Sequence, residues 1–309
     1  VQYFGYISMV IIKLTGGLGS QMSQYAYAKA LATRGYEVKI DPSQLKFYKL
    51  HDFELFRYNI DLKLSTKKEN DRFQKSNFIT NILNNCFTDH IVKRILNKAR
   101  INTYTSQVIK EKNHLFNKAF MEVNEDSYII GDFKSERYFK DIRNILLEQF
   151  TIKNKPSNYL REMELKIIRS NNSCFIHVRR GDFARNKKVF KVHGVCGADY
   201  YQSAAEYMHS HVKDVEFFVF SNDLDWCKQN LNIENSTFME NKDRRSPHED
   251  IRLMSLCQHS IIDHSAFCWW GAWLNQNEDK IVVAPTRWFS NEQFQKESED
   301  IYCEHWVKK

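Results

Sequence analysis

The sequence predicts an α/β protein with two parallel sheets, each covered by helices, that face a common cleft. Three observations predict this fold class. Apolar, β-branched segments alternate with helical segments through both halves of the chain. The 309 residues, 42% of them hydrophobic, are enough for two separate cores. Polar loops follow several strands, and ligands bind at that edge of doubly wound sheets.

The first half begins with a strand–helix–strand unit. Val10–Leu14 is apolar enough for a buried strand, and the glycine turn TGGLGSQ leads from it into a helix. We predict a second strand at Glu37–Asp41, a strand returning to the same sheet at Ser127–Phe133, and a helix at Ile142–Phe150. The segment TIKNKPSNY then carries the first proline after Pro42, so we place the domain boundary there and predict domains 1–155 and 156–309.

A basic insertion at about 61–125, which we expect to be helical, interrupts the first domain. Residues 61–120 hold 12 Lys and Arg against 5 Asp and Glu, an excess of +7 that equals the net charge of the whole chain. This surface either is solvated or contacts an anionic membrane. We expect no nucleic-acid partner, because no recognition motif or stacking array accompanies the charge.

The compartment is indicated by the cysteines and by the apolar runs. Seven cysteines are scattered without a CxxC pair, which is typical of reduced thiols in a cytoplasmic protein. No apolar run approaches the roughly 20 residues of a membrane span. The opening VQYFGYIS lacks the features of a signal peptide. Met9 stands just before the first predicted strand and is one candidate for the native start, and the sequence leaves open whether residues 1–8 belong to the native protein. Any membrane contact is therefore expected to be peripheral.

The second half shows the same alternation more clearly. Strands are predicted at Cys174–Val178, Glu216–Phe220, Ser236–Glu240 and Ser260–Asp263, and at Lys280–Pro285, which is expected to close the sheet. Helices are predicted at Tyr201–Val212, Leu224–Leu231, His248–Cys257 and Ser265–Asn275, the last being apolar with Ser265 as its N-cap.

The loop HVRRGD, residues 177–182, follows the first strand of this half. Arginine presents a planar fork of donors that fits phosphate oxygens and keeps its charge. Because adjacent side chains at a strand end alternate in direction, either Arg179 or Arg180 can face a ligand while the other braces the loop against Asp182. A surface ion-pair cluster is the alternative. The position at a strand end favours a phosphate-binding role.

Two further loops carry polar groups at strand ends. In FSNDLD, Asp223 could accept hydrogen bonds from a guanine, or Asp223-Leu-Asp225 could hold a metal, or Asp223 could cap the next helix. In DHSAFCWW, Ser265 at a helix N-terminus could hold a phosphate, or it could serve only as a cap before an aromatic core.

The glycine loop GGLGSQ follows the first strand of the chain. It lacks the GK[ST] of a nucleoside-triphosphate loop, but its glycines, Gly16, Gly17 and Gly19, let the backbone approach a ligand closely. The chain has no GxSxG elbow, no HExxH and no paired-cysteine metal motif. The loops together indicate a nucleotide diphosphate held by arginine and a helix N-terminus, with no metal required.

Several motifs now allow a family to be named. The segments IIKLTGGLGSQMSQYAYAKAL, HDFELFRYNI, GDFKSERYF, HVRRGDF, HGVCGADYY, FSNDLDW and LMSLCQHSIIDHSAFCWWGAWLN occur in the order seen in bacterial α-1,2-fucosyltransferases of glycosyltransferase family 11. The resemblance covers Val10–Phe289, with residues 65–124 the least similar. It is carried by the combination of motifs, since no single motif is specific.

The resemblance implies a GT-B-type enzyme with an N-terminal Rossmann-like domain on the acceptor side and a C-terminal one that binds GDP-fucose. It implies metal-independent transfer of L-fucose from GDP-β-L-fucose to the 2-hydroxyl of a terminal β-galactoside, with inversion. The setting would be lipopolysaccharide O-antigen or other surface glycan synthesis, at the inner face of the bacterial inner membrane. No cofactor beyond the donor substrate is implied.

The resemblance also assigns roles to residues. Arg179 would bind the β-phosphate, His177 and Asp223 would lie near the guanine, and Ser265 would lie near the diphosphate. Arg180 and Phe267 complete the implied GDP-fucose site. The loop of Gly16, Gly17, Gly19, Ser20 and Gln21 would approach the fucose and the acceptor.

The general base and the exact activity are open at this stage. Asp182 and His193, the latter in a loop expected to be flexible, are the candidate bases, and Arg179 is the expected catalytic cation. Ser20 stands where the family usually has Asn, which suggests an inactive GDP-sugar-binding protein as one alternative. Another is a fucosyltransferase of different linkage, such as α-1,6 transfer to chitin oligosaccharides.

Overall fold

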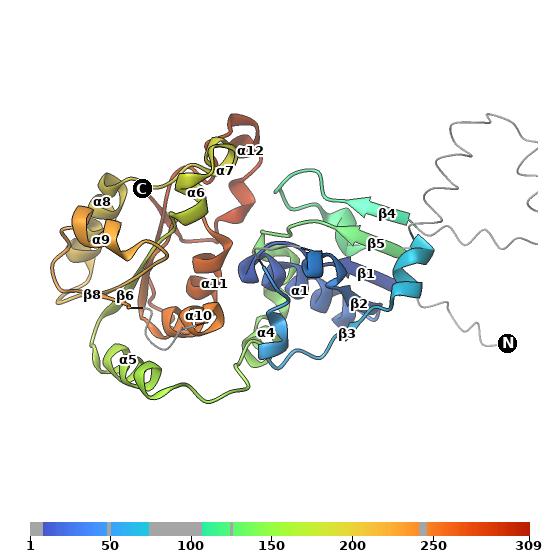
Figure 1. Cartoon of the computed structure of the whole chain (residues 1–309), viewed down its shortest axis with the longest axis horizontal. Coiled ribbons are helices and arrows are strands. Elements are labelled where there is room, and N and C mark those ends of the chain that lie inside the picture. The colour runs from blue at the N-terminus through green and yellow to red at the C-terminus, as the bar shows by residue number, and fades with distance from the viewer. Residues whose placement is uncertain (1–8, 48–50, 74–106, 124–125, 241–245) are drawn as a thin grey trace, which may run out of the picture.

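The computed structural model describes residues 9–47, 51–73, 107–123, 126–240 and 246–309, apart from the side chain of Asp182. In these residues the chain forms two parallel sheets that lie side by side, with helices around both (Figure 1). The first sheet is built from residues before 131 and the second from residues after 172. The predicted pair of doubly wound α/β units is therefore confirmed.

The first sheet has the strand order β3-β2-β1-β5-β4. Its strands are β1 (Met9–Lys13), β2 (Glu37–Asp41), β3 (Lys63–Leu64), β4 (Gln107–Lys110) and β5 (Ser127–Ile130). The central strand β1 is flanked by β2 and β5, and its middle residues Val10, Ile11 and Ile12 are fully buried. A strand covered on both faces needs such an unbroken apolar run.

Helices pack around this sheet. α1 (Leu18–Thr33) and α4 (Arg143–Gln149) are accompanied by short 3-10 helices at Ser43–Phe47, Leu55–Arg57, Lys118–Met121, Glu136–Tyr138 and Lys140–Ile142. α1 is followed by Gly35, whose φ of 95° is the left-handed conformation that commonly ends a helix. The predicted first unit, strand, glycine turn, helix and strand, is present as expected.

The basic insertion is in part wrongly predicted. Its residues Gln107–Lys110 form β4, a parallel edge strand beside β5, where a helix was expected. Val108 and Ile109 are β-branched and suit a strand. Residues 74–106 and 124–125, which include five of the 12 Lys and Arg of the insertion, lie outside the described residues.

The second sheet has the strand order β11-β10-β9-β6-β7-β8. Its strands are β6 (Ser173–Val178), β7 (Glu216–Ser221), β8 (Ser236–Phe238), β9 (His259–Ile261), β10 (Val282–Ala284) and β11 (Val307–Lys308). The expectation that Lys280–Pro285 closes the sheet is wrong, because β11 pairs beyond β10 at that edge. A strand of two residues is too short to show a period in the sequence.

Eight α-helices in the described residues and one 3-10 helix, Glu299–Ile301, accompany this sheet. The α-helices are α5 (Asn158–Arg169), α6 (Gly181–Arg185), α7 (Lys187–His193), α8 (Ala198–His211), α9 (Leu224–Asn230), α10 (Pro247–Leu256), α11 (Ala266–Leu274) and α12 (Glu292–Lys296). The short helices α6 and α7 were missed in the sequence, where their charged residues resemble a loop. None of the helices in the described ranges is long and apolar enough to cross a bilayer.

The two halves are joined by packing between α1 and α11 (Figure 1). The indole of Trp270 is fully buried, stacks on Phe139 at a centroid distance of 5.4 Å, and donates a hydrogen bond to the Ser23 hydroxyl at 3.1 Å. Trp269 and Trp273 are 2% and 4% exposed, so the tryptophans belong to the core, as predicted. This packing fixes the start of α1 against the start of α11. The boundary between 155 and 156, which lies between α4 and α5, stays a proposal.

Candidate active site

One cleft, of about 490 Å³, is lined by residues from both halves of the molecule. From the first half it is lined by Gly17, Gly19 and Ser20 of the glycine loop. From the second half it is lined by His177, Arg179, His193, Ser265 and Phe267. Loops that follow β1, β6 and β9 therefore meet in one place, as the carboxyl-end rule for such sheets predicts.

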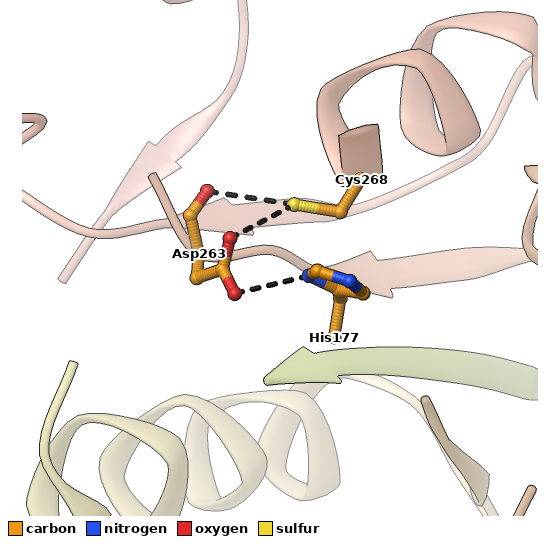
Figure 2. A group of neighbouring side chains, drawn as sticks. All are labelled: His177, Asp263 and Cys268. Atoms are coloured by element: carbon orange, nitrogen blue, oxygen red, sulfur yellow. Dashed lines mark hydrogen bonds and ion pairs between the residues drawn. The ribbon is translucent and has the colours of Figure 1, made fainter. Parts of the chain in front are cut away.

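Asp263 organises the second-half side of the cleft (Figure 2). It follows β9, is fully buried, and its carboxylate accepts hydrogen bonds from His177 Nδ1 at 3.0 Å, from the backbone N–H of Arg179 at 2.5 Å and from that of Ser265 at 2.9 Å. Burial works to raise the pKa of Asp263, but His177 and the hydrogen bonds outweigh it and lower the pKa to about 2. The ionised carboxylate thus ties three site residues together.

His177, Asp263 and Cys268 also lie close enough to hold a metal ion. In this structure the three groups satisfy one another. The Cys268 thiol donates to the Asp263 carboxylate at 3.2 Å, and burial raises the pKa of that thiol well above its usual value. Because the carboxylate only accepts, His177 carries its proton on Nδ1. We interpret the group as a hydrogen-bonded network, and the absence of a metal requirement stays a prediction.

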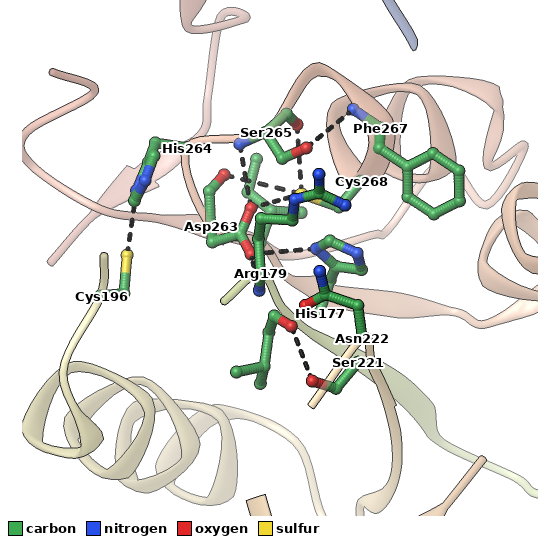
Figure 3. A network of polar contacts seen from close by, with 12 residues as sticks. His177, Arg179, Cys196, Ser221, Asn222, Asp263, His264, Ser265, Phe267 and Cys268 are labelled. Carbon is green, nitrogen blue, oxygen red and sulfur yellow. Dashed lines mark hydrogen bonds and ion pairs between the residues drawn. The ribbon is translucent and has the colours of Figure 1, made fainter. Parts of the chain in front are cut away.

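The two adjacent arginines point to different neighbours. Arg179 lines the cleft, and its guanidinium carbon lies 5.3 Å from the ring centroid of Phe183 (Figure 3). The guanidinium of Arg180 stacks on Trp226 at 3.9 Å, and its Nε lies 3.9 Å from the Asp223 carboxylate. Arg179 is thus the arginine that faces the cleft, and bracing by Asp182 stays untested, because its side chain lies outside the described part of the structure.

The structure separates Asp223 from the cleft residues. Its carboxylate caps α9 by accepting from the Trp226 N–H at 3.4 Å, which is the capping alternative considered from the sequence. Its neighbours Ser221 and Asn222 line the cleft instead. A role for Asp223 in binding guanine therefore rests on the family resemblance alone.

His193 ends the helix α7, so the expectation of a flexible loop at this position is wrong. Its ring stacks on Phe183 at a centroid distance of 4.7 Å and an interplanar angle of 19°. The next loop is held by His264, whose Nε2 donates to the Gly194 carbonyl at 3.2 Å while its Nδ1 lies 3.3 Å from the Cys196 thiol (Figure 3). The packing of these rings holds His193 at the cleft.

The glycine loop divides into residues at the cleft and residues that shape the loop. Gly17, Gly19 and Ser20 line the cleft, whereas Gly16 adopts a φ of 72° that favours glycine. Gln21 is fully buried, and its amide donates to the carbonyls of Gly16 at 3.0 Å and Asp52 at 2.8 Å. Gln21 is thus a positioning residue that ties the loop to the following segment.

Two helix N-termini meet at the cleft. α1 begins at Leu18 and α11 at Ala266, where the Ser265 hydroxyl accepts from the Phe267 N–H at 3.3 Å, as predicted for an N-cap. A Cβ added to Gly19 would lie 2.6 Å from the backbone of Ala266 and Phe267. Helix N-termini carry partial positive charge and free N–H groups, so together with Arg179 they make this part of the cleft electropositive.

Gly19→Ala is expected to disturb this junction. The added methyl group would meet backbone atoms that cannot rotate away, so α1 and α11 must separate, at a cost of about 1–3 kcal/mol in unfolding free energy. Urea unfolding should show this loss, and calorimetry should show weaker binding of GDP if the cleft holds the nucleotide that the family resemblance implies. Gly197→Ala is the matched control, because nothing lies within 4 Å of its added Cβ. Equal stability and GDP affinity in Gly19→Ala and wild type would contradict the close contact.

Several residues that line the cleft or support it were missed in the sequence. Asp263 and His264 belong to the quoted motif DHSAFCWW, and Asp132 and Lys134 belong to GDFKSERYF, but none of them received a role. Asp132 and Lys134 lie on the first-half wall of the cleft, after β5. The signal that could have found Asp132 and Asp263 is a carboxylate two residues after the end of a buried strand, close to the sheet edge that also pointed to Arg179.

Comparisons with known proteins were made for the whole chain. Residues 2–309 match glycosyl transferase family 11. An α-1,2-colitosyltransferase of Escherichia coli is 33% identical over 98% of this chain and 99% of its own. The O-antigen biosynthesis glycosyltransferase WbnK of Escherichia coli is 31% identical over 90% of this chain and 94% of its own. A bovine galactoside α-(1,2)-fucosyltransferase 2 is more distant, 26% identical over 46% of this chain and 43% of its own.

Among solved structures, NodZ, an α-1,6-fucosyltransferase soaked with GDP-fucose, covers 87% of this chain and 93% of its own, with a TM-score of 0.51 and 14% identity. At that identity the likeness shows the fold, which confirms the predicted GT-B-type arrangement of two α/β units around a cleft. The family match spans nearly the whole chain, and two relatives above 30% identity align with it almost end to end. The chain therefore belongs to glycosyl transferase family 11.

Proposed function

We propose that the chain transfers a 6-deoxy-L-sugar from its GDP derivative to the 2-hydroxyl of a terminal β-galactoside, with GDP-β-L-fucose as the first candidate donor. One observation carries the proposal. Arg179 and the N-terminus of α11 meet the glycine loop in a single cleft between two GT-B-type domains. That arrangement supplies positive charge for a diphosphate and leaves the first-half wall for sugars.

The chemistry follows from the bonds involved. A β-linked donor and an α-linked product require inversion, so the acceptor oxygen displaces GDP in one step through an oxocarbenium-like transition state. GDP gains negative charge as the bond to the sugar breaks, and Arg179 with the helix N-terminus would stabilise that charge without a metal. The acceptor proton needs a base. His193, at the cleft, and Asp182 remain the proposed candidates.

A second donor is supported by a specific observation. The relative aligned with almost the whole chain is named an α-1,2-colitosyltransferase. Colitose is L-fucose without its 3-hydroxyl. The same residues would therefore bind the diphosphate of GDP-colitose, and the same displacement of GDP would transfer the sugar. The α-1,6 alternative has support only from a fold likeness at 14% identity, and it is therefore less favoured.

The test is transfer itself, in the presence of EDTA. The protein is incubated with GDP-fucose or GDP-colitose and a panel of β-galactosides, and the linkage of each product is determined. The proposal predicts α-1,2-linked product on at least one galactoside, with no loss of rate on chelation. An α-1,6 product, or a rate restored only by added divalent metal, would contradict it. GDP binding without product from any donor and acceptor would favour the inactive sugar-binding alternative.

We further propose that the protein acts on surface-glycan precursors at the cytoplasmic face of the inner membrane. The WbnK match to an O-antigen enzyme supports this setting. The positive charge of residues 61–120 supports a peripheral contact with anionic lipid. Co-sedimentation with vesicles should then rise with anionic lipid content and fall with salt. Binding that is indifferent to both would contradict the membrane contact.

A further inference from the structure

The first-half wall of the cleft carries an ion pair that the donor site does not use. Asp132 and Lys134 lie in the segment after β5, and both line the cleft opposite the loop of Arg179. The Lys134 ammonium is 2.9 Å from the Asp132 carboxylate. The Lys134 side chain is 14% exposed and that of Asp132 38%, so both groups line the cleft and the carboxylate is the more accessible of the two.

The segment is held rigidly from behind. Glu111, just after β4, accepts hydrogen bonds through one carboxylate oxygen from the N–H groups of Asp132 at 2.7 Å and Phe133 at 3.1 Å. Phe133 has a φ of 46°, a conformation that a residue with a side chain adopts only when its surroundings enforce it. Its ring is fully buried and stacks on Tyr27 at 3.8 Å. The position of Asp132 is therefore fixed before any ligand binds.

The charges around Asp132 decide what it can do. The ammonium of Lys134 is the main cause that lowers the pKa of Asp132, and His114 and His193 act in the same direction. His114 itself is largely neutral at neutral pH, because burial and then Lys134 lower its pKa to about 4. An ionised carboxylate already paired with an ammonium is a weak base. Asp132 is thus suited to accept hydrogen bonds and poorly suited to remove a proton.

The pair places a hydrogen-bond acceptor, the Asp132 carboxylate, beside a hydrogen-bond donor, the Lys134 ammonium. The charges of the two groups cancel. A diphosphate would gain nothing from such a pair, since Asp132 repels it as much as Lys134 attracts it. Neighbouring hydroxyls of a pyranose both donate and accept, so they match a carboxylate beside an ammonium. Two short charge-assisted hydrogen bonds would also fix the orientation of the ring. The ligand that fits is an uncharged sugar.

We propose that the Asp132–Lys134 pair binds hydroxyls of the acceptor sugar, other than the reacting one, and so selects the acceptor. This inference rests on the proposed transferase function and deepens it. The donor nucleotide is assigned to the opposite wall, where Arg179 and Ser265 lie, so the pair faces the space from which the acceptor must approach. Asp132 and Lys134 are specificity residues in this account, and Glu111 is a positioning residue behind them.

Three variants test the inference: Asp132→Asn, Lys134→Gln and the double variant. Acceptor kinetics are measured at saturating GDP-fucose with the galactoside that gives the best transfer. Each single variant is expected to lower kcat/KM for the acceptor about tenfold or more, mainly by raising KM. The loss in the double variant should be smaller than the product of the two single losses, because the two side chains act as a pair. GDP affinity and slow donor hydrolysis without acceptor should stay within about twofold of wild type. Lys118→Gln, in the exposed pair with Glu122 on the same half, is the matched control.

Deoxy acceptors supply a readout that misfolding would not reproduce. A galactoside that lacks one of the bound hydroxyls, other than the 2-hydroxyl, should have a lower kcat/KM than the parent galactoside with the wild type. With the variant that lacks the side chain bound to that hydroxyl, the two galactosides should have the same kcat/KM. Direct binding of methyl β-galactoside to the GDP-saturated protein is measured in parallel by NMR. Unchanged acceptor kinetics, or a loss confined to GDP binding or donor hydrolysis, would overturn the inference while leaving the proposed function intact. A wild type that neither transfers to nor binds any galactoside would overturn both.

Discussion

Arg179→Ala is expected to reduce transfer about 100- to 1,000-fold while the protein stays folded. The guanidinium lines the cleft and is the fixed cation proposed to face the β-phosphate as GDP departs. Losing one preorganised donor from a developing charge costs about 3–4 kcal/mol of transition-state stabilisation. Steady-state rates of the transfer reaction measure the loss, and thermal unfolding checks that the fold is retained.

Arg179→Lys tests whether the positive charge at this position is sufficient or whether the planar geometry of the guanidinium is also needed. Lysine keeps one positive charge but loses the planar fork, so it should restore only part of the rate. Arg185→Ala, an exposed position at the end of the next helix, serves as a control for the loss of an arginine nearby. Transfer by Arg179→Ala at near wild-type rate would remove Arg179 from the mechanism.

Asp263→Ala is expected to have the second large effect, on both folding and activity. The carboxylate is fully buried and holds His177 and the backbone N–H groups of Arg179 and Ser265 in place. Removing it leaves buried donors without partners, a loss of about 3–5 kcal/mol in unfolding free energy by analogy with broken buried pairs. Transfer should fall even under conditions where the variant is folded, because both groups proposed to bind phosphate, Arg179 and Ser265, lose their support.

The pH dependence of stability gives an independent check on Asp263. Pairing lowers its pKa from the usual 3.8 to about 2, so the stability it contributes is present above pH 3.8 and is lost as the pH falls through about 2. The difference in unfolding free energy between wild type and Asp263→Asn should therefore become smaller as the pH falls through that range. Ser255→Ala, on the neighbouring helix α10, is a control in which one local side-chain hydrogen bond is lost. A stability gap that stays constant down to pH 2 would contradict the assigned pKa.

Much of the fold could be predicted from the sequence because the strands are buried on both faces. Runs such as Val10–Ile12 and Phe217–Phe220 are apolar throughout, and the polar residues that follow these strands mark the sheet edge where ligands are expected to bind. The position of Arg179 and Ser265 after buried strands predicted, from the sequence alone, that both lie at the ligand-binding edge of the sheet. Helix α11 and its cap were found in the same way. The sequence misled where elements are very short or marginal, as at β4 and β11.

The rest of the site depends on contacts between distant segments. His177 and Asp263 are 86 residues apart in the chain, and no local pattern reveals that the carboxylate of one holds the ring of the other. Asp132 is placed by Glu111, 21 residues earlier, through a strand that the sequence did not predict. Arg180 likewise has its partners on another loop. The proposed diphosphate-binding residues Arg179 and Ser265 could be predicted from the sequence, whereas the proposed acceptor residues Asp132 and Lys134 and the residues that position the site appear only in the folded chain.

Arg179 and the start of α11 are proposed to bind the diphosphate of a GDP-sugar without a metal. Calorimetric binding of GDP and GMP, in EDTA, to the wild type and to Arg179→Ala tests this proposal most directly. Charge-assisted hydrogen bonds to the β-phosphate should make GDP bind about 10- to 100-fold more tightly than GMP in the wild type. In Arg179→Ala this preference should shrink to a few-fold at most. A preference that survives in Arg179→Ala, or GDP binding that appears only with added Mg²⁺, would contradict the account.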